Sequence, residues 1–457
     1  MAMADKFDCV VIGSGPGGYV GAIRAAQLGM KTAVVEKENV GGRCLNEACI
    51  PAKAMLRVAE VLDEVSHAKQ FGISVNGREF DWSGAAKHRD RVTKTLTDGV
   101  GLLFRKNKIE VVEGRGSLTS DANVRVGDRE IEADRVVLAC GSVPRPVLDL
   151  EFGERVLDTA GTWLLAEQPD SLCVIGAGAS GTEVASAFGR LGTEVLLLEA
   201  LDRILPLEDA EIARACAREI AKQDVEIVTG AKVESVETSD QGVEVTYRGE
   251  TEEFDYLCIA AGRAADVEGL GLDEAGVERD ENGLVAVDGR MRTSREGVWA
   301  IGDMVPGPAL AHKASDEGII AVEDAAGRET HPIDYRFVPS VTFCHPQVAS
   351  FGMTEQEARD AGHDVVVGKV PMGAVGAPTV YGDRSGMIKI VGEKRYGELL
   401  GGHILSVRAA DLIQELVNAH DLEGGFPEVA RSIHPHPAFA EVVMEAARAT
   451  DGWLIHG

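Results

Sequence analysis

A glycine-rich turn that occurs twice constrains the fold more than any other feature of the sequence. Each turn lies between a short apolar run, typical of a buried strand, and a run typical of a helix. In both copies a second apolar run ends in a glutamate, Glu36 or Glu199, 23 positions after the first glycine. Such a turn brings backbone N–H groups close to a pyrophosphate, and the acid accepts hydrogen bonds from a ribose. The repeat predicts two dinucleotide-binding α/β units, with turn glycines Gly13, Gly15 and Gly18 in the first and Gly176, Gly178 and Gly181 in the second.

Two cysteines, Cys44 and Cys49, follow the first unit closely. Four residues between them are too many for a Cys-x-x-Cys redox turn. Five positions on a helix are about 1.4 turns, so the two side chains meet only if the helix is distorted there. Pro51 and the Gly41–Gly42 pair are the local features that allow a distortion. The pattern indicates electron transfer between a dithiol and a bound dinucleotide.

Composition narrows the class of protein. A formal net charge of −28 argues against nucleic acid as a partner, since phosphate binding needs clustered Lys and Arg. No run of 18 apolar residues is present, so we expect no membrane span. Only one pair of the eight cysteines is closely spaced, which fits one catalytic disulfide in a reducing cytoplasm, with most of the other cysteines in the core. We expect no metal site.

The remaining patterns predict the domain organisation. Residues 120–140 are rich in strand patterns, and 257–260 and 298–301 read as further buried strands. From about Asp334 strand-like pieces precede helical runs at 409–420 and 438–447, which predicts a separate α+β domain. The predicted domains are 1–150 and 271–335 as two parts of one dinucleotide-binding domain, 151–270 as the second, and 336–457 at the C-terminal end.

These residues together resemble a known family, the FAD-dependent pyridine nucleotide–disulfide oxidoreductases, and within it the dihydrolipoamide-oxidising members. The resemblance covers nearly the whole chain. It rests on both fingerprints, the Cys44–Cys49 run ending at Lys53, and three later motifs: Ala300–Asp303, Ala309–His312, and His434–Pro437 followed by Glu441. It implies FAD in the first unit, NAD in the second, and a homodimer built on the C-terminal domain.

The resemblance also implies site residues. Those expected at FAD are Gly13, Gly15, Gly18, Glu36, Lys37, Gly42, Arg43, Cys44, Lys53, Gly116, Cys140, Gly141, Ser142, Gly302, Asp303, Ala309, Leu310, Ala311 and His312. Those expected at NAD are Gly176, Gly178, Gly181, Glu183, Glu199, Val233 and Gly262. Lys53 is expected near the flavin and paired with Glu183.

His436 and Glu441 also carry a physical argument. A carboxylate bonded to one imidazole nitrogen sets the tautomer and stabilises the imidazolium, so the other nitrogen can take a thiol proton. An isolated histidine in a proline-rich turn would be interpreted as a surface residue. The resemblance favours a catalytic role for His436 instead. It implies that this pair acts on the disulfide of the partner subunit. His434, two residues away, can be purely structural.

The expected activity is NAD-dependent oxidation of protein-bound dihydrolipoamide, with a lipoyl-bearing acyltransferase of a 2-oxo-acid dehydrogenase complex as partner. Glu199 favours NAD because a carboxylate repels the 2′-phosphate of NADP, although Arg203 lies four residues on. Departures from the family pattern at Arg43, Glu47, Ala48, Cys140 and Ala438 remove no reacting group. The alternative is a related NAD(P)H-dependent reductase of a low-molecular-weight disulfide. The intact set of reacting residues argues against a non-catalytic flavoprotein.

Overall fold

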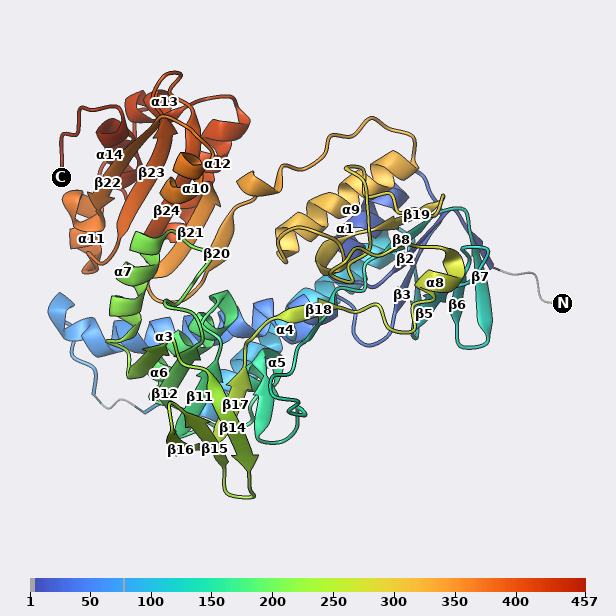
Figure 1. The fold of residues 1–457 in the computed structure, drawn as a ribbon, viewed down its shortest axis with the longest axis horizontal. Coiled ribbons are helices and arrows are strands. Elements are labelled where there is room, and N and C mark those ends of the chain that lie inside the picture. Colours follow the sequence, from blue (N-terminus) through green and yellow to red (C-terminus); the bar gives the residue numbers. More distant parts are fainter. Residues whose placement is uncertain (1–4, 77–78) are drawn as a thin grey trace. The chain divides into compact units, whose positions relative to one another are not determined.

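The computed structural model describes residues 5–76 and 79–457. The chain divides into two compact units, each built from three segments (Figure 1). The first unit comprises Met1–Ala54, Gly84–Arg145 and Gly262–Tyr335. The second comprises Met55–Ser83, Pro146–Ala261 and Arg336–Gly457. Each unit therefore assembles its core from residues that lie far apart in the sequence.

The first unit contains a parallel sheet with the strand order β19-β8-β2-β3-β4. Its strands are β2 (Cys9–Ile12), β3 (Thr32–Glu36), β4 (Glu110–Glu113), β8 (Val136–Leu138) and β19 (Val298–Ala300). All residues of β2, β3, β8 and β19 are buried, as expected for a parallel sheet covered on both faces. The sequence pattern suggested one strand over residues 7–12. The structure instead separates β1 (Asp5–Phe7) from β2, because β1 pairs with β7 (Arg129–Ala133) in a neighbouring sheet.

Helices α1 (Pro16–Gln27) and α9 (Ala311–Ala325) pack against each other in this unit (Figure 1). Glycines allow the close approach, since a Cβ on Gly17 would stand 2.7 Å from the carbonyl oxygen of Ala314. The remaining elements that lie wholly in this unit are α2 (Gly42–Asn46), β5 (Gly116–Leu118), β6 (Val124–Val126), β9 (Ser142–Pro144), β18 (Arg263–Ala265), α8 (Leu272–Ala275) and η2 (Gly302–Met304). Helices α3 (Cys49–His67) and α4 (Trp82–Lys106) contribute residues to both units.

The second unit contains its own parallel sheet, with the order β10-β17-β11-β12-β13. Its strands are β10 (Val156–Asp158), β11 (Ser171–Ile175), β12 (Glu194–Glu199), β13 (Val225–Thr229) and β17 (Tyr256–Ile259). The helices of this part are α5 (Thr159–Trp163), α6 (Ala179–Leu191) and α7 (Ala210–Ile220). A small antiparallel sheet accompanies them, made of β14 (Val233–Thr238), β15 (Val243–Tyr247) and β16 (Glu250–Phe254). The parallel sheets of the two units have the same layout around their glycine turns: β11, β12 and β13 occupy the places that β2, β3 and β4 occupy in the first unit.

The C-terminal part of the second unit is an antiparallel sheet with helices. The strand order is β20-β21-β24-β23-β22, with β20 (Ser340–Thr342), β21 (Gln347–Gly352), β22 (Val365–Pro371), β23 (Met387–Glu393) and β24 (Leu399–Ser406). The helices are α10 (Glu355–Asp360), α11 (Gly376–Tyr381), α12 (Ala409–Asp421), α13 (Phe426–Arg431) and α14 (Glu441–Thr450). The predicted α/β fold class is confirmed. Helix α14 begins three residues later than the expected 438.

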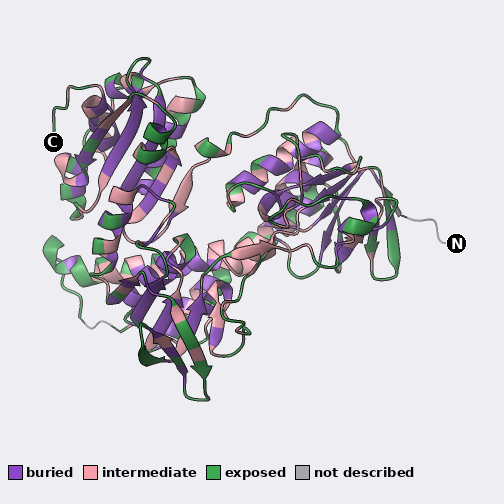
Figure 2. Cartoon of the chain, viewed as in Figure 1, coloured by how far each residue is buried: buried purple, intermediate pink, exposed green. Residues whose placement is uncertain are grey.

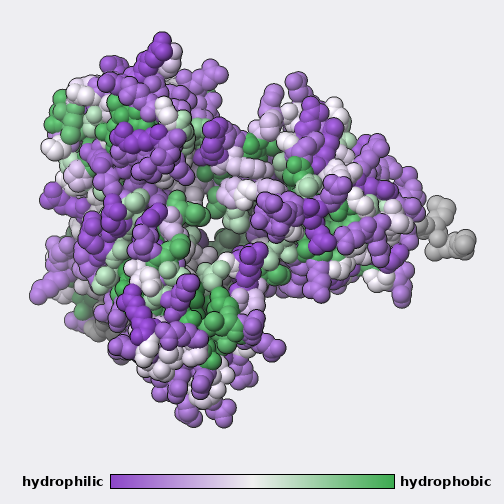
Figure 3. Space-filling model, in the orientation of Figure 1, coloured by the Kyte–Doolittle hydropathy of each residue, from purple (hydrophilic) through white to green (hydrophobic). Residues whose placement is uncertain are grey.

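Buried residues gather in the sheets and on the helix faces that cover them (Figure 2). Hydrophilic side chains dominate the face seen in Figure 3, as expected for a chain with 74 acidic and 46 basic residues. Within residues 5–76 and 79–457, no helix combines the length and apolar character needed to cross a membrane.

Candidate functional site

The two glycine-rich turns have the same local geometry. Gly13 has φ +103° and Gly176 has φ +99°, which L-residues with a side chain adopt rarely. A Cβ on Gly18 or Gly181 would overlap the carbonyl oxygen of Gly13 or Gly176, respectively. Glycine at these positions therefore lets each turn close tightly between its strand and its helix, as the fingerprints predict.

The turns leave room in front of two helix N-termini. Gly15 and Gly178 are the N-cap residues of α1 and α6, and neither helix has a side-chain hydrogen bond at its cap. A Cβ built on either glycine would meet no atom within 4 Å. N–H groups of a helix's first turn lack partners within the helix and attract anions. Both places therefore fit the pyrophosphate of a dinucleotide.

A buried carboxylate closes each of these places. The Glu36 carboxylate accepts hydrogen bonds from Ser14 N at 2.9 Å and from Glu38 N at 2.9 Å. The Glu199 carboxylate accepts from Ala177 N at 2.7 Å and Leu201 N at 2.8 Å. A carboxylate offers about four acceptor positions, so each retains capacity for a ribose hydroxyl. The neighbouring Lys37 donates to Asp266 at 2.8 Å, at the edge of a cavity of about 820 Å³ that is also lined by Arg115.

Cys44 and Cys49 lie on two successive helices. Cys44 belongs to α2, and Cys49 is the first residue of α3. The distortion expected from the five-residue spacing is thus a break at Glu47 and Ala48. Pro51 explains it, because its nitrogen has no hydrogen to donate to the carbonyl of Glu47. Gly41, with φ +98°, forms the N-cap of α2.

The two sulfur groups interact directly. A hydrogen bond with Cys49 and burial raise the pKa of the Cys44 thiol, while the charge of Lys53 lowers it. Burial and then the charge of Cys44 raise the pKa of Tyr19 on α1. The dithiol, Lys53 and α1 therefore lie together in the first unit.

Other residues expected at FAD line the ends of strands in the same unit. The Ser142 hydroxyl donates to Asp303 Oδ2 at 2.5 Å and accepts from Arg263 Nε at 2.7 Å. Cys140 N lies 3.3 Å from the Met304 sulfur, and burial raises the pKa of the Cys140 thiol to about 12. Gly116 opens β5, Gly302 opens η2, Leu310 is the N-cap of α9, and Ala311 and His312 are its first residues.

The residues expected at NAD divide between the units. Gly176, Gly178, Gly181 and Glu199 surround the second turn, and the buried Glu183 accepts from Phe343 N at 2.8 Å. Val233 begins β14 in the second unit, while Gly262 belongs to the first unit. Lys53 and Glu183 also belong to different units, so their pairing stays a prediction.

His436 and His434 have different surroundings. The His436 Nδ1 atom lies 2.9 Å from Glu441 Oε1, and its side chain is 75% exposed. Burial raises the pKa of Glu441, but hydrogen bonds from Ala438 N and His436 outweigh it and lower this pKa below its usual value. His434 is nearly buried, with both ring nitrogens hydrogen-bonded, and the bond to Glu415 raises its pKa. The His436 ring is therefore open to solvent, whereas the His434 ring is enclosed.

Several contacts of the site were not foreseen. Arg263 next to Ser142, and Glu415 next to His434, come from segments far away in the sequence. The Lys313–Glu317 pair on α9 could have been found from the sequence, because the two opposite charges lie four positions apart directly after Ala309–His312. In the second unit, the buried Cys216 and Cys344 sulfur atoms lie 3.7 Å apart.

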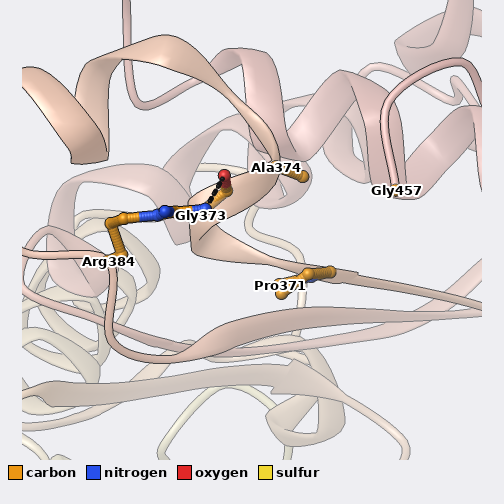
Figure 4. Close-up of a pocket in the computed structure, with 5 residues that line it drawn as sticks. All are labelled: Pro371, Gly373, Ala374, Arg384 and Gly457. Atoms are coloured by element: carbon orange, nitrogen blue, oxygen red, sulfur yellow. Dashed lines mark hydrogen bonds between the residues drawn. The ribbon is translucent and has the colours of Figure 1, made fainter.

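A shallow cavity of about 560 Å³ lies in the C-terminal part of the second unit (Figure 4). Arg384 Nη2 donates to the carbonyl of Gly373 at 3.0 Å across its wall. None of the expected site residues lines this cavity.

Family models and curated relatives match nearly the whole chain. Residues 7–318 match the pyridine nucleotide-disulphide oxidoreductase model, and residues 338–447 match the dimerisation domain of the same family, which supports a homodimer. The dihydrolipoyl dehydrogenase of Chlamydia muridarum is 40% identical over 451 residues, 97% of each chain. That of Bacillus subtilis is 39% identical over 479 residues, which cover 99% of this chain and 100% of the relative.

Solved structures agree over the full length. LpdA from Mycobacterium tuberculosis aligns with a TM-score of 0.89 and 25% identity, covering 97% of this chain and 99% of that one. The HOCl-induced flavoprotein disulfide reductase RclA from Escherichia coli aligns with a TM-score of 0.87 and 27% identity, covering 96% and 99%. With both fingerprints, the dithiol and the C-terminal domain in place, the chain belongs to the pyridine nucleotide-disulphide oxidoreductase family.

Proposed function

We propose that the chain catalyses NAD-dependent oxidation of protein-bound dihydrolipoamide, using a Cys44–Cys49 disulfide and FAD. The observation that carries the proposal is the dithiol beside the first dinucleotide turn, where a Cβ on Gly42 of α2 would stand 2.7 Å from Gly15 Cα. The curated relatives named dihydrolipoyl dehydrogenase, about 40% identical over the full length, support this substrate over other disulfides.

The residues around the first turn fit FAD. The helix N-terminus of α1 takes the pyrophosphate, Glu36 the adenosine ribose, and Asp303 the ribityl or pyrophosphate region. The second turn and Glu199 take NAD in the same way. When bound, FAD supplies the two-electron chemistry that links the dithiol to NAD⁺.

The first step moves one proton and breaks one bond. A substrate thiol gives its proton to His436, whose other nitrogen is held by Glu441. The resulting thiolate attacks Cys44, the bond between Cys44 and Cys49 breaks, and Cys49 leaves as a thiolate. The ionised Glu441 stabilises the imidazolium that forms, and the cation of Lys53 favours the thiolate.

The second step closes the product. The remaining substrate sulfur loses its proton to water and attacks the sulfur bonded to Cys44. The cyclic disulfide forms, and Cys44 leaves and takes the proton held by His436. The substrate has then lost two electrons and two protons, one of which is on Cys44. With the disulfide re-formed, the net products are lipoamide, NADH and one proton.

The proposed partner is a lipoyl-bearing acyltransferase of a 2-oxo-acid dehydrogenase complex, because its swinging lipoyl group carries the substrate dithiol. In the proposed homodimer His436 and Glu441 of one subunit serve the dithiol of the other. The active site would then exist only in the dimer.

A substrate panel tests the proposal. Dihydrolipoamide with NAD⁺ is compared with glutathione, mycothiol and coenzyme A disulfides, each with NADH and NADPH, using the FAD-loaded protein. We expect dihydrolipoamide and NAD⁺ to give the highest kcat/KM. A higher value for a low-molecular-weight disulfide would replace this proposal with the related reductase activity.

A further inference from the structure

A fully buried ion pair lies on α9, directly after the segment expected beside the flavin. Lys313 Nζ and Glu317 Oε1 are 3.0 Å apart, and both side chains are 0% exposed. The Tyr335 hydroxyl donates to the same Glu317 oxygen at 2.5 Å. Removing two charges from water costs several kcal/mol per ion, and a pair of apolar residues often stabilises a fold as well. The ion pair therefore calls for a role beyond packing.

The two charged groups hold the backbone of one residue, Gly302, on both sides of its Cα. Glu317 Oε2 accepts a hydrogen bond from Gly302 N at 2.8 Å, and Lys313 Nζ donates to Gly302 O at 2.9 Å. Gly302 has φ +79° and begins η2. Its N–H and its carbonyl are thus bound by two side chains one helical turn apart, and these charged hydrogen bonds are the strong kind.

Gly302 precedes Asp303 directly. The Asp303 carboxylate accepts from the Ser142 hydroxyl, which accepts in turn from Arg263 Nε. Two constraints set the direction of the Asp303 side chain: the bound backbone of Gly302 on one side and the Ser142 hydroxyl on the other. Only the first of these depends on α9.

We propose that Lys313 and Glu317 are positioning residues for FAD, which hold the backbone of Gly302 so that Asp303 faces the bound cofactor. The inference rests on the proposed function, in which Asp303 contacts FAD. If the ion pair only stabilised the fold, a substitution that keeps the stability of the protein should also keep its affinity for FAD.

The test separates stability from FAD affinity. The double variant Lys313→Met/Glu317→Met replaces the pair with apolar side chains of similar length. We expect the thermal midpoint of its apoprotein to lie close to that of the unaltered apoprotein, while the FAD dissociation constant rises about tenfold or more. The constant is measured by flavin fluorescence during reconstitution, and the flavin reduction potential of the loaded protein is expected to shift with it.

A matched pair of single variants provides the control. Glu317→Gln and Asp324→Asn each neutralise a buried carboxylate on α9, and Asp324 pairs with Arg292 rather than with Gly302. We expect Glu317→Gln to weaken FAD binding and Asp324→Asn to leave it within about threefold. If the double variant does not fold, the comparison of Glu317→Gln with Asp324→Asn tests the inference by itself.

A double variant that binds FAD within about threefold of the unaltered protein would overturn the inference. An unaltered apoprotein that binds no FAD would instead overturn the proposed function, so the two failures are distinguishable.

Discussion

Gly42 of α2 lies against Gly15 of the first dinucleotide turn, with only 2.7 Å between a Cβ built on Gly42 and Gly15 Cα. Gly42 also has φ +60°. The helix that carries Cys44 is therefore placed by direct backbone contact with the turn expected to hold FAD. The position of the dithiol therefore depends on the absence of a side chain at Gly42.

We expect Gly42→Ala to weaken FAD binding by about tenfold or more and to lower the thermal midpoint, because the new methyl group meets the backbone of Gly15. Gly29→Ala is the matched control, since Gly29 has φ +90° but open space around its Cβ position. Both variants carry the cost of a left-handed alanine, about 1–2 kcal/mol. Equal FAD dissociation constants for the two would contradict the role of this contact.

His436 and His434 should respond differently to substitution. We expect His436→Ala to lower dihydrolipoamide oxidation by ~10²–10⁴-fold, as typical for loss of a general base, with FAD binding and NADH reduction of artificial acceptors intact. His434→Gln should instead lower the thermal midpoint, because a neutral amide replaces the imidazolium that pairs with Glu415. Steady-state kinetics and thermal unfolding separate the two. The reverse pattern would show that the histidine roles are exchanged.

The pH dependence of stability should follow His434. Its pKa is raised in the folded chain, so the imidazolium stabilises the fold below the unfolded pKa of about 6.5. This contribution is lost as the pH rises through the raised folded pKa. The difference in thermal midpoint between the unaltered protein and His434→Gln should be largest near pH 5.5 and shrink at higher pH, and Glu415→Gln should show the same trend. A difference independent of pH would refute this assignment.

Glu199 should set the choice of pyridine nucleotide. We expect kcat/KM for NAD⁺ to exceed that for NADP⁺, because the 2′-phosphate would meet a buried carboxylate. Glu199→Gln should lower the ratio of kcat/KM for NAD⁺ to kcat/KM for NADP⁺ by roughly tenfold, which corresponds to about 1.4 kcal/mol. Glu194→Gln, at the exposed start of the same strand, is the control and should leave the ratio unchanged. Equal kcat/KM for both cofactors in the unaltered protein would exclude this role.

Hybrid dimers should reveal the shared active site. Cys44→Ser and His436→Ala are each expected to be inactive with dihydrolipoamide. After subunit exchange, a hybrid dimer contains one site with every group and one site that lacks both. Activity should return to at most about half of normal per hybrid dimer. Verified hybrids that stay inactive, with both variants folded and loaded with FAD, would show that each subunit uses its own histidine.

Local patterns carried much of this fold. The sequence predicts the glycine turn, the helix after it and the strand that ends in a glutamate, Glu36 or Glu199, and the structure places all three there in both units. Each of these elements depends on residues close to it in the sequence. The α+β pattern after residue 334 was readable for the same reason. The resemblance of the motifs to a family also identified the family that the comparisons confirm.

Tertiary structure decided which side chains meet. Pro51 allowed a distortion in principle, but only the structure places a break between α2 and α3 and brings the thiols into contact. Nothing in the local pattern pairs His434 with Glu415 or directs Lys313 and Glu317 to the backbone of Gly302. Strands and turns follow from residues a few positions apart. Buried polar partners follow from packing, because a group removed from water must find its hydrogen bonds among segments that only folding brings together.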